Sequence, residues 1–293
     1  LLPDQASSSQ SSLSLTIKFS RTLFKLNQLL ETATIIDDAM SSRTPPTFLL
    51  VPGAWHRPWS FDLLRDDLHG RGFSTETVTL AGVGSTDVNV GLEQDTAAVR
   101  TELQKLIDDG REVVVVAHSY GGVPTANAVE GFNYKDRVAQ SKTGGVLMVV
   151  YMTSFAIGAG SALFDGAGSV PWWDVKDGFI SPLDPISVFY ADVEPALAAE
   201  AVEALRPQPF KTFQDKSSFE PWNEGFEMGY IFAENDQAIP LDLQIMMASQ
   251  FSPSSFTASL SASHSPFLSM PKDLGDALQQ AAKTAVAKTE GLR

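Results

Sequence analysis

The segment EVVVVAHSYGG, residues Glu112–Gly122, decides the fold. Its run of valines is typical of a strand that is buried on both faces of a parallel sheet. The residues AHSYG that follow have the small–x–Ser–x–small pattern of a sharp strand-to-helix turn, where a larger side chain at Ala117 or Gly121 would collide. Residues 122–129 have helical spacing. We therefore predict that Ser119 is a nucleophile near a helix N-terminus, whose free N–H groups favour negative charge.

The segments on either side of this turn alternate between short apolar runs and amphipathic stretches with helical spacing. Strands are expected at residues 47–51, 73–80, 112–117, 145–151, 226–232 and 255–260. Helices are expected at residues 59–68, 92–107, 122–129, 195–205, 240–250 and 266–286. Such alternation predicts an α/β fold with a mostly parallel, doubly wound sheet of about six strands.

The alternation is interrupted at residues 155–223, which are rich in Gly, Pro and aromatic side chains. This stretch is too long for a loop in a compact domain and contains one clear helix. We therefore expect an inserted, mainly helical cap, or lid. The core of the domain would then consist of residues 44–154 and 224–293, with residues 1–43 outside it as an N-terminal extension.

Residues 1–39 combine a Ser/Gln-rich tract with a basic, acid-poor amphipathic stretch. Three interpretations stay open: an upstream extension with no role in the fold, an organelle-targeting segment, or an interaction arm. Met40 and the polar, proline-containing residues after it lead directly into the first strand, as a natural start would. This arrangement favours the first interpretation.

The composition excludes several classes of function. Hydrophobic residues make up 43% and charged residues 19% of the 293 positions, as in a globular protein with a sizeable core. The formal net charge of −14 disfavours nucleic acid as a partner. The chain has no cysteine, which excludes disulfides and thiol catalysis and leads us to expect a cytoplasmic location. The four histidines lack metal-ligand spacing, and no apolar run is long enough for a transmembrane segment.

A nucleophilic serine needs a base, and the base needs an acid that orients it. His264 lies between the last expected strand and the last helix, and Asp236 lies just after the preceding strand. Both therefore belong to the sheet edge that carries Ser119, and their order along the chain is Ser, acid, His. A helix-capping role is the alternative for His264. Glu234 competes with Asp236 but lies in or near the strand.

The reaction also needs donors for the oxyanion of the transition state. The backbone N–H of Tyr120, directly after the proposed nucleophile, is the first candidate. The second is the backbone N–H of Ala54, in the turn after the first strand, where Gly53 permits close approach of the chain. The alternative is an ordinary strand-ending turn. His118 is adjacent to the serine, so its side chain should point away from it, and we interpret it as structural.

Motifs in this order resemble one branch of the α/β hydrolases: the plant methylesterases, hydroxynitrile lyases and microbial salicylate-esterase-like enzymes. The motifs are Leu50–His56, Ala117–Gly122, Asp236–Pro240 and His264–Phe267, with the cap stretch 193–209. The resemblance covers residues 47–286. Two positions differ from the branch: Pro52 replaces the usual His before Gly53, and Ser265 replaces the Lys that hydroxynitrile lyases carry after the histidine.

The resemblance implies a cofactor-free esterase with a small apolar pocket beneath a helical cap. Ser119, Asp236 and His264 would be its triad, with Ala54 and Tyr120 as oxyanion donors. The candidate substrate-binding residues are Trp55, Phe155, Trp172 and Trp173; the alternative is that the cap aromatics only pack against each other.

We therefore expect a serine hydrolase that cleaves a small, apolar carboxylic ester or lactone. Ser265 argues against cyanohydrin cleavage. Two alternatives remain: a lyase, cyclase or C–C-cleaving enzyme of specialised metabolism, and a small-molecule receptor that has kept the hydrolase fold. The sequence leaves the natural substrate and the oligomeric state open, a homodimer included.

Overall fold

The computed structural model of this protein describes residues 44–167 and 170–292. The N-terminal extension expected at residues 1–43 lies outside these ranges. No helix in the described part of the chain is both long enough and apolar enough to cross a membrane.

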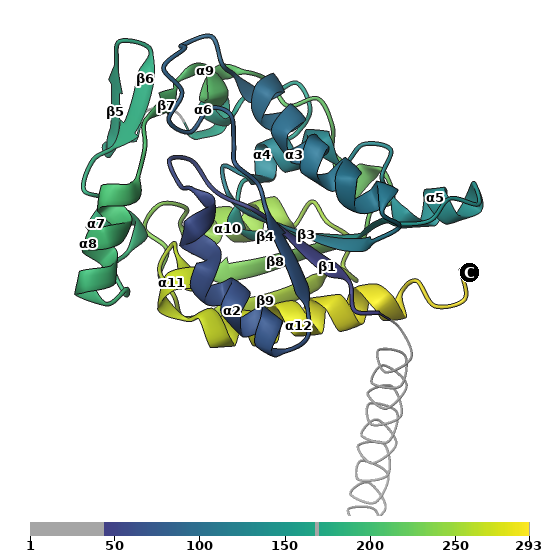
Figure 1. Cartoon of the computed structure of the whole chain (residues 1–293). Coiled ribbons are helices and arrows are strands. Elements are labelled where there is room, and N and C mark those ends of the chain that lie inside the picture. Colours follow the sequence, from purple (N-terminus) through teal and green to yellow (C-terminus); the bar gives the residue numbers. More distant parts are fainter. Residues whose placement is uncertain (1–43, 168–169, 293) are drawn as a thin grey trace, which may run out of the picture. The chain divides into compact units, whose positions relative to one another are not determined.

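Six strands form a single sheet in which every neighbouring pair is parallel (Figure 1). In order across the sheet, the strands are β2 (Ser74–Thr77), β1 (Thr47–Val51), β3 (Glu112–Ser119), β4 (Gly145–Ser154), β8 (Met228–Ala233) and β9 (Phe256–Leu260). The strand order reverses beside β1 and β3, as in a doubly wound sheet. The fold class predicted from the sequence is confirmed.

The middle of this sheet is the hydrophobic core. Every residue of β4 is buried, and so is every residue of β3 after Glu112. Burying each valine of β3 contributes about 1.5–3 kcal/mol of hydrophobic stabilisation. Burial alternates along β2 and β9, the two edge strands. A strand was expected at residues 73–80, but β2 covers only Ser74–Thr77.

Helices cover both faces of the sheet. Figure 1 shows α2 (Asp62–Gly70) and α12 (Pro271–Ala287) together on one face, with α3 (Leu92–Asp108) and α4 (Gly122–Ala128) on the other. The remaining helices of the core are η1 (Pro58–Phe61), α5 (Tyr134–Ala139), α10 (Leu241–Ala248) and α11 (Pro266–Ser269). This arrangement leaves the carboxyl ends of the strands available for a site.

The expectation of one closing helix over residues 266–286 is wrong. The structure has two helices, α11 and α12, separated at Met270, whose φ of −135° is not helical. The physical reason is Pro271, which disfavours helical backbone at the residue before it and is well suited to the first position of a new helix.

Residues 155–223, called the insert below, lie between β4 and β8. The insert contains α8 (Pro195–Ala204), which matches the helix expected there. Its other helices are α6 (Leu163–Ala167), α7 (Pro185–Phe189), α9 (Lys211–Gln214) and η2 (Pro221–Asn223). It also has a small antiparallel sheet that the sequence did not predict: β5 (Trp173–Lys176), β6 (Phe179–Pro182) and β7 (Gln208–Pro209).

Candidate active site

Ser119 lies on the sharp turn between β3 and α4. Its φ is 52°, in the left-handed region that residues other than glycine seldom adopt. The turn is closely packed. A Cβ atom at Gly121 would clash with the Pro52 carbonyl oxygen, and one at Gly53 would lie 2.8 Å from the Ser119 Cβ. Small residues around the serine therefore let two stretches of backbone pass this closely.

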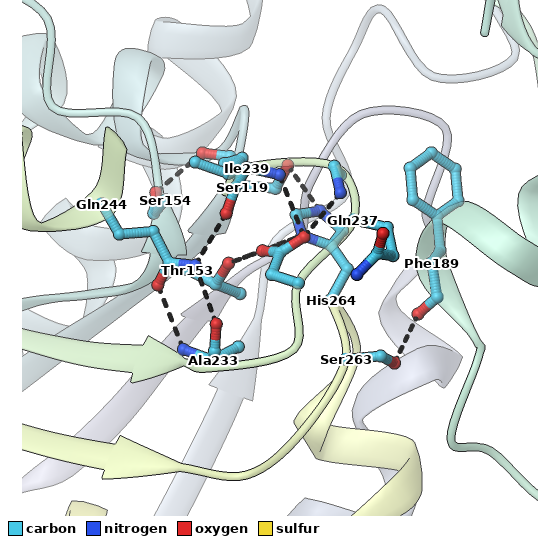
Figure 2. A network of polar contacts seen from close by, with 12 residues as sticks. Ser119, Thr153, Ser154, Phe189, Ala233, Gln237, Ile239, Gln244, Ser263 and His264 are labelled. Carbon is cyan, nitrogen blue, oxygen red and sulfur yellow. Dashed lines mark hydrogen bonds and ion pairs between the residues drawn. The ribbon is translucent and has the colours of Figure 1, made fainter. Parts of the chain in front are cut away.

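The structure brings Ser119, His264 and Asp236 together at the carboxyl ends of the strands. His264 Nε2 lies 2.9 Å from Ser119 Oγ, and His264 Nδ1 lies 2.8 Å from Asp236 Oδ2. With a proton on Nδ1, the imidazole donates to the carboxylate and accepts from the serine hydroxyl. All three residues are buried. Figure 2 shows Ser119 and His264 within one continuous polar network.

Four donors hold the Asp236 carboxylate. Its Oδ1 accepts from the backbone N–H groups of Ala238 at 2.7 Å and Ile239 at 3.0 Å. Its Oδ2 accepts from His264 and, in a short hydrogen bond, from the Thr153 hydroxyl. Hydrogen bonds of this kind favour the ionised carboxylate and fix its orientation. The loop after β8 is therefore built to present a carboxylate to His264.

Thr153 was missed by the sequence analysis. It is fully buried, and its φ of 38° is an outlier for a β-branched residue. Strained backbone of this kind clusters at functional sites. Its hydroxyl contacts Asp236 and lies 3.5 Å from His264 Nδ1. The available signal was a threonine near the carboxyl end of an otherwise apolar strand.

Glu234, the competing acid, points elsewhere. It is exposed and accepts from the Ser261 hydroxyl at 2.7 Å. Asp236 is two residues further along, on the turn itself, and it is Asp236 that contacts His264. The geometry thus places Asp236, and not Glu234, beside His264.

Two more buried histidines lie beside His264. The His118 ring is 4.6 Å from the His264 ring, and its Nε2–H donates to the His264 carbonyl oxygen at 2.9 Å. His56 donates from Nδ1 to the Ala54 carbonyl oxygen at 2.7 Å and accepts the Tyr190 hydroxyl at Nε2 at 2.8 Å. His118, interpreted above as structural, thus contacts the backbone of the base rather than the serine hydroxyl.

Burial keeps these two histidines neutral. It lowers the pKa of His56 to about 4 and that of His118 well below its ordinary value, and a positive charge on His264 would lower both further. Near pH 7 neither ring carries a charge. They therefore add no fixed positive charge beside His264.

A small pocket of about 20 Å³ lies at Ser119. It is lined by Ala54, Trp55, Ser119, Tyr120, Phe155, Trp172, Trp173, Phe213, Ala238 and Ile239. The structure thus places both oxyanion candidates and all four candidate substrate-binding residues around the serine. Phe213, Ala238 and Ile239 were not anticipated from the sequence. Across residues 44–167 and 170–292, no cluster of three or more His, Asp or Glu side chains could hold a metal ion.

The insert holds the loop that carries Ala54. Trp55, the next residue, has a φ of 64° and donates from its backbone N–H to Gln208 Oε1 at 3.0 Å. Its indole Nε1–H donates to the Ile180 carbonyl oxygen at 2.9 Å, and its own carbonyl oxygen accepts from the Arg206 backbone at 3.1 Å. Three hydrogen bonds from the insert therefore orient this loop beside Ser119.

A second buried carboxylate, Asp95, holds the Tyr120 side chain. The Tyr120 hydroxyl donates to Asp95 Oδ2 at 2.7 Å, and the Gly82 backbone N–H donates to Asp95 Oδ1 at 2.7 Å. Burial raises the pKa of Asp95 to about 6, although these hydrogen bonds act in the opposite direction. The sequence analysis missed Asp95. Its signal was its position on the apolar face of a helix, four residues before Val99.

The chain belongs to the alpha/beta hydrolase family, whose model matches residues 48–277. That range runs from β1 into α12 and includes Ser119, Asp236 and His264. The strand order and the strand-to-helix turn described above agree with this assignment.

Several relatives carry names of hydrolases or esterases. The alpha/beta hydrolase nvfD of Aspergillus novofumigatus is 28% identical over 248 residues, which cover 82% of this chain and 98% of the relative. The pFDCC methylesterase MES16 of Arabidopsis thaliana is 24% identical over 247 residues, which cover 78% of this chain and 90% of the relative. The resemblance to the plant methylesterase branch is confirmed, and the chain is a hydrolase of this family.

Solved structures show the same fold. A pyrethroid hydrolase from Sphingobium faniae superposes with a TM-score of 0.65 at 21% identity, covering 81% of this chain and 97% of the other. The Arabidopsis methylesterase MES16 superposes with a TM-score of 0.62 at 23% identity, covering 82% and 99%. At such identities the likeness establishes the fold alone.

Proposed function

We propose that this protein is a serine esterase that hydrolyses small, apolar carboxylic esters or lactones. The observation that carries the proposal is the 2.9 Å contact between His264 Nε2 and Ser119 Oγ, with His264 Nδ1 on Asp236. A serine hydroxyl is a weak nucleophile until an adjacent base removes its proton. Membership of a hydrolase family with methylesterase relatives supports the same reaction class.

In the first half of the reaction, Ser119 Oγ attacks the ester carbonyl carbon and its proton passes to His264 Nε2. Asp236 stabilises the imidazolium and does not take the proton itself. The carbonyl electron pair moves to oxygen, and the backbone N–H groups of Ala54 and Tyr120 stabilise that oxyanion. When the intermediate collapses, the alcohol leaves with the proton from His264, and the acyl group stays on Ser119.

In the second half, water takes the place of the alcohol. His264 accepts a proton from the water as its oxygen attacks the acyl carbon, and the same two N–H groups stabilise the second oxyanion. Collapse breaks the bond to Ser119 Oγ, which regains a proton from His264. The products are the carboxylic acid and the free enzyme. The residues of the chain supply every step, so the proposal requires neither a metal nor a cofactor.

We propose further that the insert acts as a cap over this site. Trp172, Trp173 and Phe213 of the insert line the Ser119 pocket. Apolar rings at this position limit the water around the reacting ester and strengthen the electrostatic interactions there. They also favour an apolar substrate.

Replacing the nucleophile tests the proposal. In Ser119→Ala, turnover of 4-nitrophenyl acetate should fall by at least about 10³-fold, and a fluorophosphonate probe should no longer label the protein. The matched control is Ser60→Ala, which removes a buried hydroxyl that has no hydrogen-bond partner within the described residues. The control should keep both properties.

Undiminished turnover or labelling in Ser119→Ala would contradict the proposal. Tight binding of ester analogues by the wild-type protein without any turnover would instead favour a ligand-binding receptor. Cleavage of ketone substrates in preference to esters would favour the lyase or C–C-cleaving class.

A further inference from the structure

The Ser119 pocket is too small for a large ester. Its volume of about 20 Å³ lies far below the range of roughly 300–1,000 Å³ that is usual for ligand sites. The rings of Trp55, Trp172, Trp173 and Phe213 form much of its wall. A long chain or ring system attached to the ester carbonyl therefore needs space outside this pocket.

A larger hollow of about 320 Å³, open to solvent, lies between residues 155–165 and α10. Its apolar lining residues include Ile157, Leu163, Leu243, Met246 and Met247. No Lys, Arg or His contributes to the lining as the described residues define it. Unbranched, polarizable methionines adapt to ligands of different shape. The hollow is therefore suited to an apolar group rather than to an ion.

Two polar side chains in the wall of this hollow already have partners. Gln250 Nε2 donates to the carbonyl oxygens of Ala156 at 3.0 Å and Met247 at 3.1 Å. Asp165 Oδ2 accepts from the Ala162 backbone N–H at 3.0 Å. These groups stabilise the walls, and they have less hydrogen-bonding capacity left to attract a polar ligand.

Phe155 separates the two spaces, because it lines both the Ser119 pocket and the hollow. Its backbone is held in place: its N–H donates to the Ser119 carbonyl oxygen at 3.1 Å. Its side chain is only partly buried. A side chain can change rotamer without moving its backbone, so the ring can move while the backbone beside the nucleophile stays in place.

We propose that the hollow is the subsite for an extended apolar arm of the substrate and that Phe155 is the partition an arm must pass to reach it. The proposal rests on the esterase function proposed above and specifies its substrate class: esters with an apolar chain or ring system longer than the Ser119 pocket can hold. Binding free energy from the remote arm would then help position the ester carbonyl at Ser119.

The test is the chain-length preference, measured as the ratio of kcat/KM for the longest ester to that for the shortest. One series, 4-nitrophenyl acetate to 4-nitrophenyl decanoate, varies the acyl arm, and a second, ethyl acetate to decyl acetate, varies the alcohol arm. Met246→Lys places a charge in the hollow and should lower the ratio about tenfold in the series whose arm enters it. Phe155→Ala removes the partition and should raise the same ratio.

The matched control is Ile245→Lys. Ile245 precedes Met246 on α10, is similarly exposed at 50% against 58%, and does not line the hollow. The control should leave the ratio unchanged in both series. If the wild-type protein hydrolyses these esters but none of the variants alters its chain-length preference, the proposed subsite is wrong and the proposed function stands. A wild-type protein that hydrolyses no ester in either series would overturn the proposed function and the subsite with it.

Discussion

Asp236 and Asp95 are both buried carboxylates, and both act on the turn that carries Ser119. Asp236 contacts His264, which contacts the serine hydroxyl. Asp95 accepts from the hydroxyl of Tyr120, the residue after the serine. One carboxylate therefore faces the group proposed to move a proton, while the other faces the side chain of a proposed oxyanion donor.

The partners of the two carboxylates explain the difference. Asp236 has four donors, and its imidazole partner can become positively charged during the proposed reaction, so an ionised acid stabilises it. The phenol partner of Asp95 gains no such charge. Burial raises the pKa of Asp95 to about 6, closer to pH 7. The same chemical group can thus serve proton transfer or backbone positioning, depending on what it contacts.

Asp236→Asn should have the largest effect on this comparison. The amide nitrogen donates where the carboxylate accepted, so the imidazole is held in the wrong tautomer. We expect kcat for 4-nitrophenyl acetate to fall about 10³- to 10⁴-fold. In the matched variant Asp95→Asn, the loss should stay below about tenfold, because no proton transfer involves Asp95. Equal losses in steady-state kinetics would remove the distinction between the two acids.

The second prediction concerns the pH dependence of the free energy of unfolding. Burial raises the pKa of Asp95 from 3.8 to about 6, so the folded protein binds more protons than the unfolded chain in that range. Its contribution to stability falls by about 2 kcal/mol as pH rises from 4 to 6. Burial lowers the pKa of His56 from 6.5 to about 4, so its contribution rises by about 2 kcal/mol over the same range.

Single variants should separate these opposing slopes. Asp95→Asn removes the fall, so its stability should rise more steeply than that of the wild-type protein between about pH 4 and 6. His56→Gln removes part of the rise and should give a shallower profile. Urea unfolding followed across this pH range measures both. Profiles parallel to wild type in both variants would contradict the pKa shifts.

Thr153→Val should lower activity less than Asp236→Asn does. It keeps the β-branched shape but removes one donor to Asp236, which is worth about 2 kcal/mol when the acceptor is charged. We expect kcat to fall roughly ten- to thirtyfold. The matched control is Thr125→Val, because the Thr125 hydroxyl is buried with no partner in the part of the chain described. Equal kcat values in the two variants would show that Thr153 does not position Asp236.

The parts of this site that the sequence predicted are those that local patterns specify. A run of valines and small residues around Ser119 defines a buried strand and a sharp turn. Asp236 and His264 each follow a strand, and a parallel sheet brings such positions to one edge. Order along the chain was therefore enough to predict proximity in space.

The missed parts depend on packing between distant segments. Asp95 reads locally as an acid in the first turn of a helix, and only the contact of α3 with α4 brings it to Tyr120. Thr153 lies in a strand that reads as apolar core, and its role depends on the neighbouring β8 loop. The strands of the insert have only two to four residues each, too few to show the alternation that identifies a strand.

The tryptophans clustered around Trp55 should make ligand binding in the pocket detectable by intrinsic fluorescence. The ring centroids of Trp55 and Trp172 are 5.9 Å apart, and those of Trp172 and Trp173 are 5.8 Å apart. Three of the chain's five tryptophans therefore line the Ser119 pocket. Indole emission responds to the polarity around the ring, so a ligand entering the pocket should change the protein's own fluorescence. The binding of a ligand to the Ser119→Ala protein could then be followed in real time by this fluorescence, without a label.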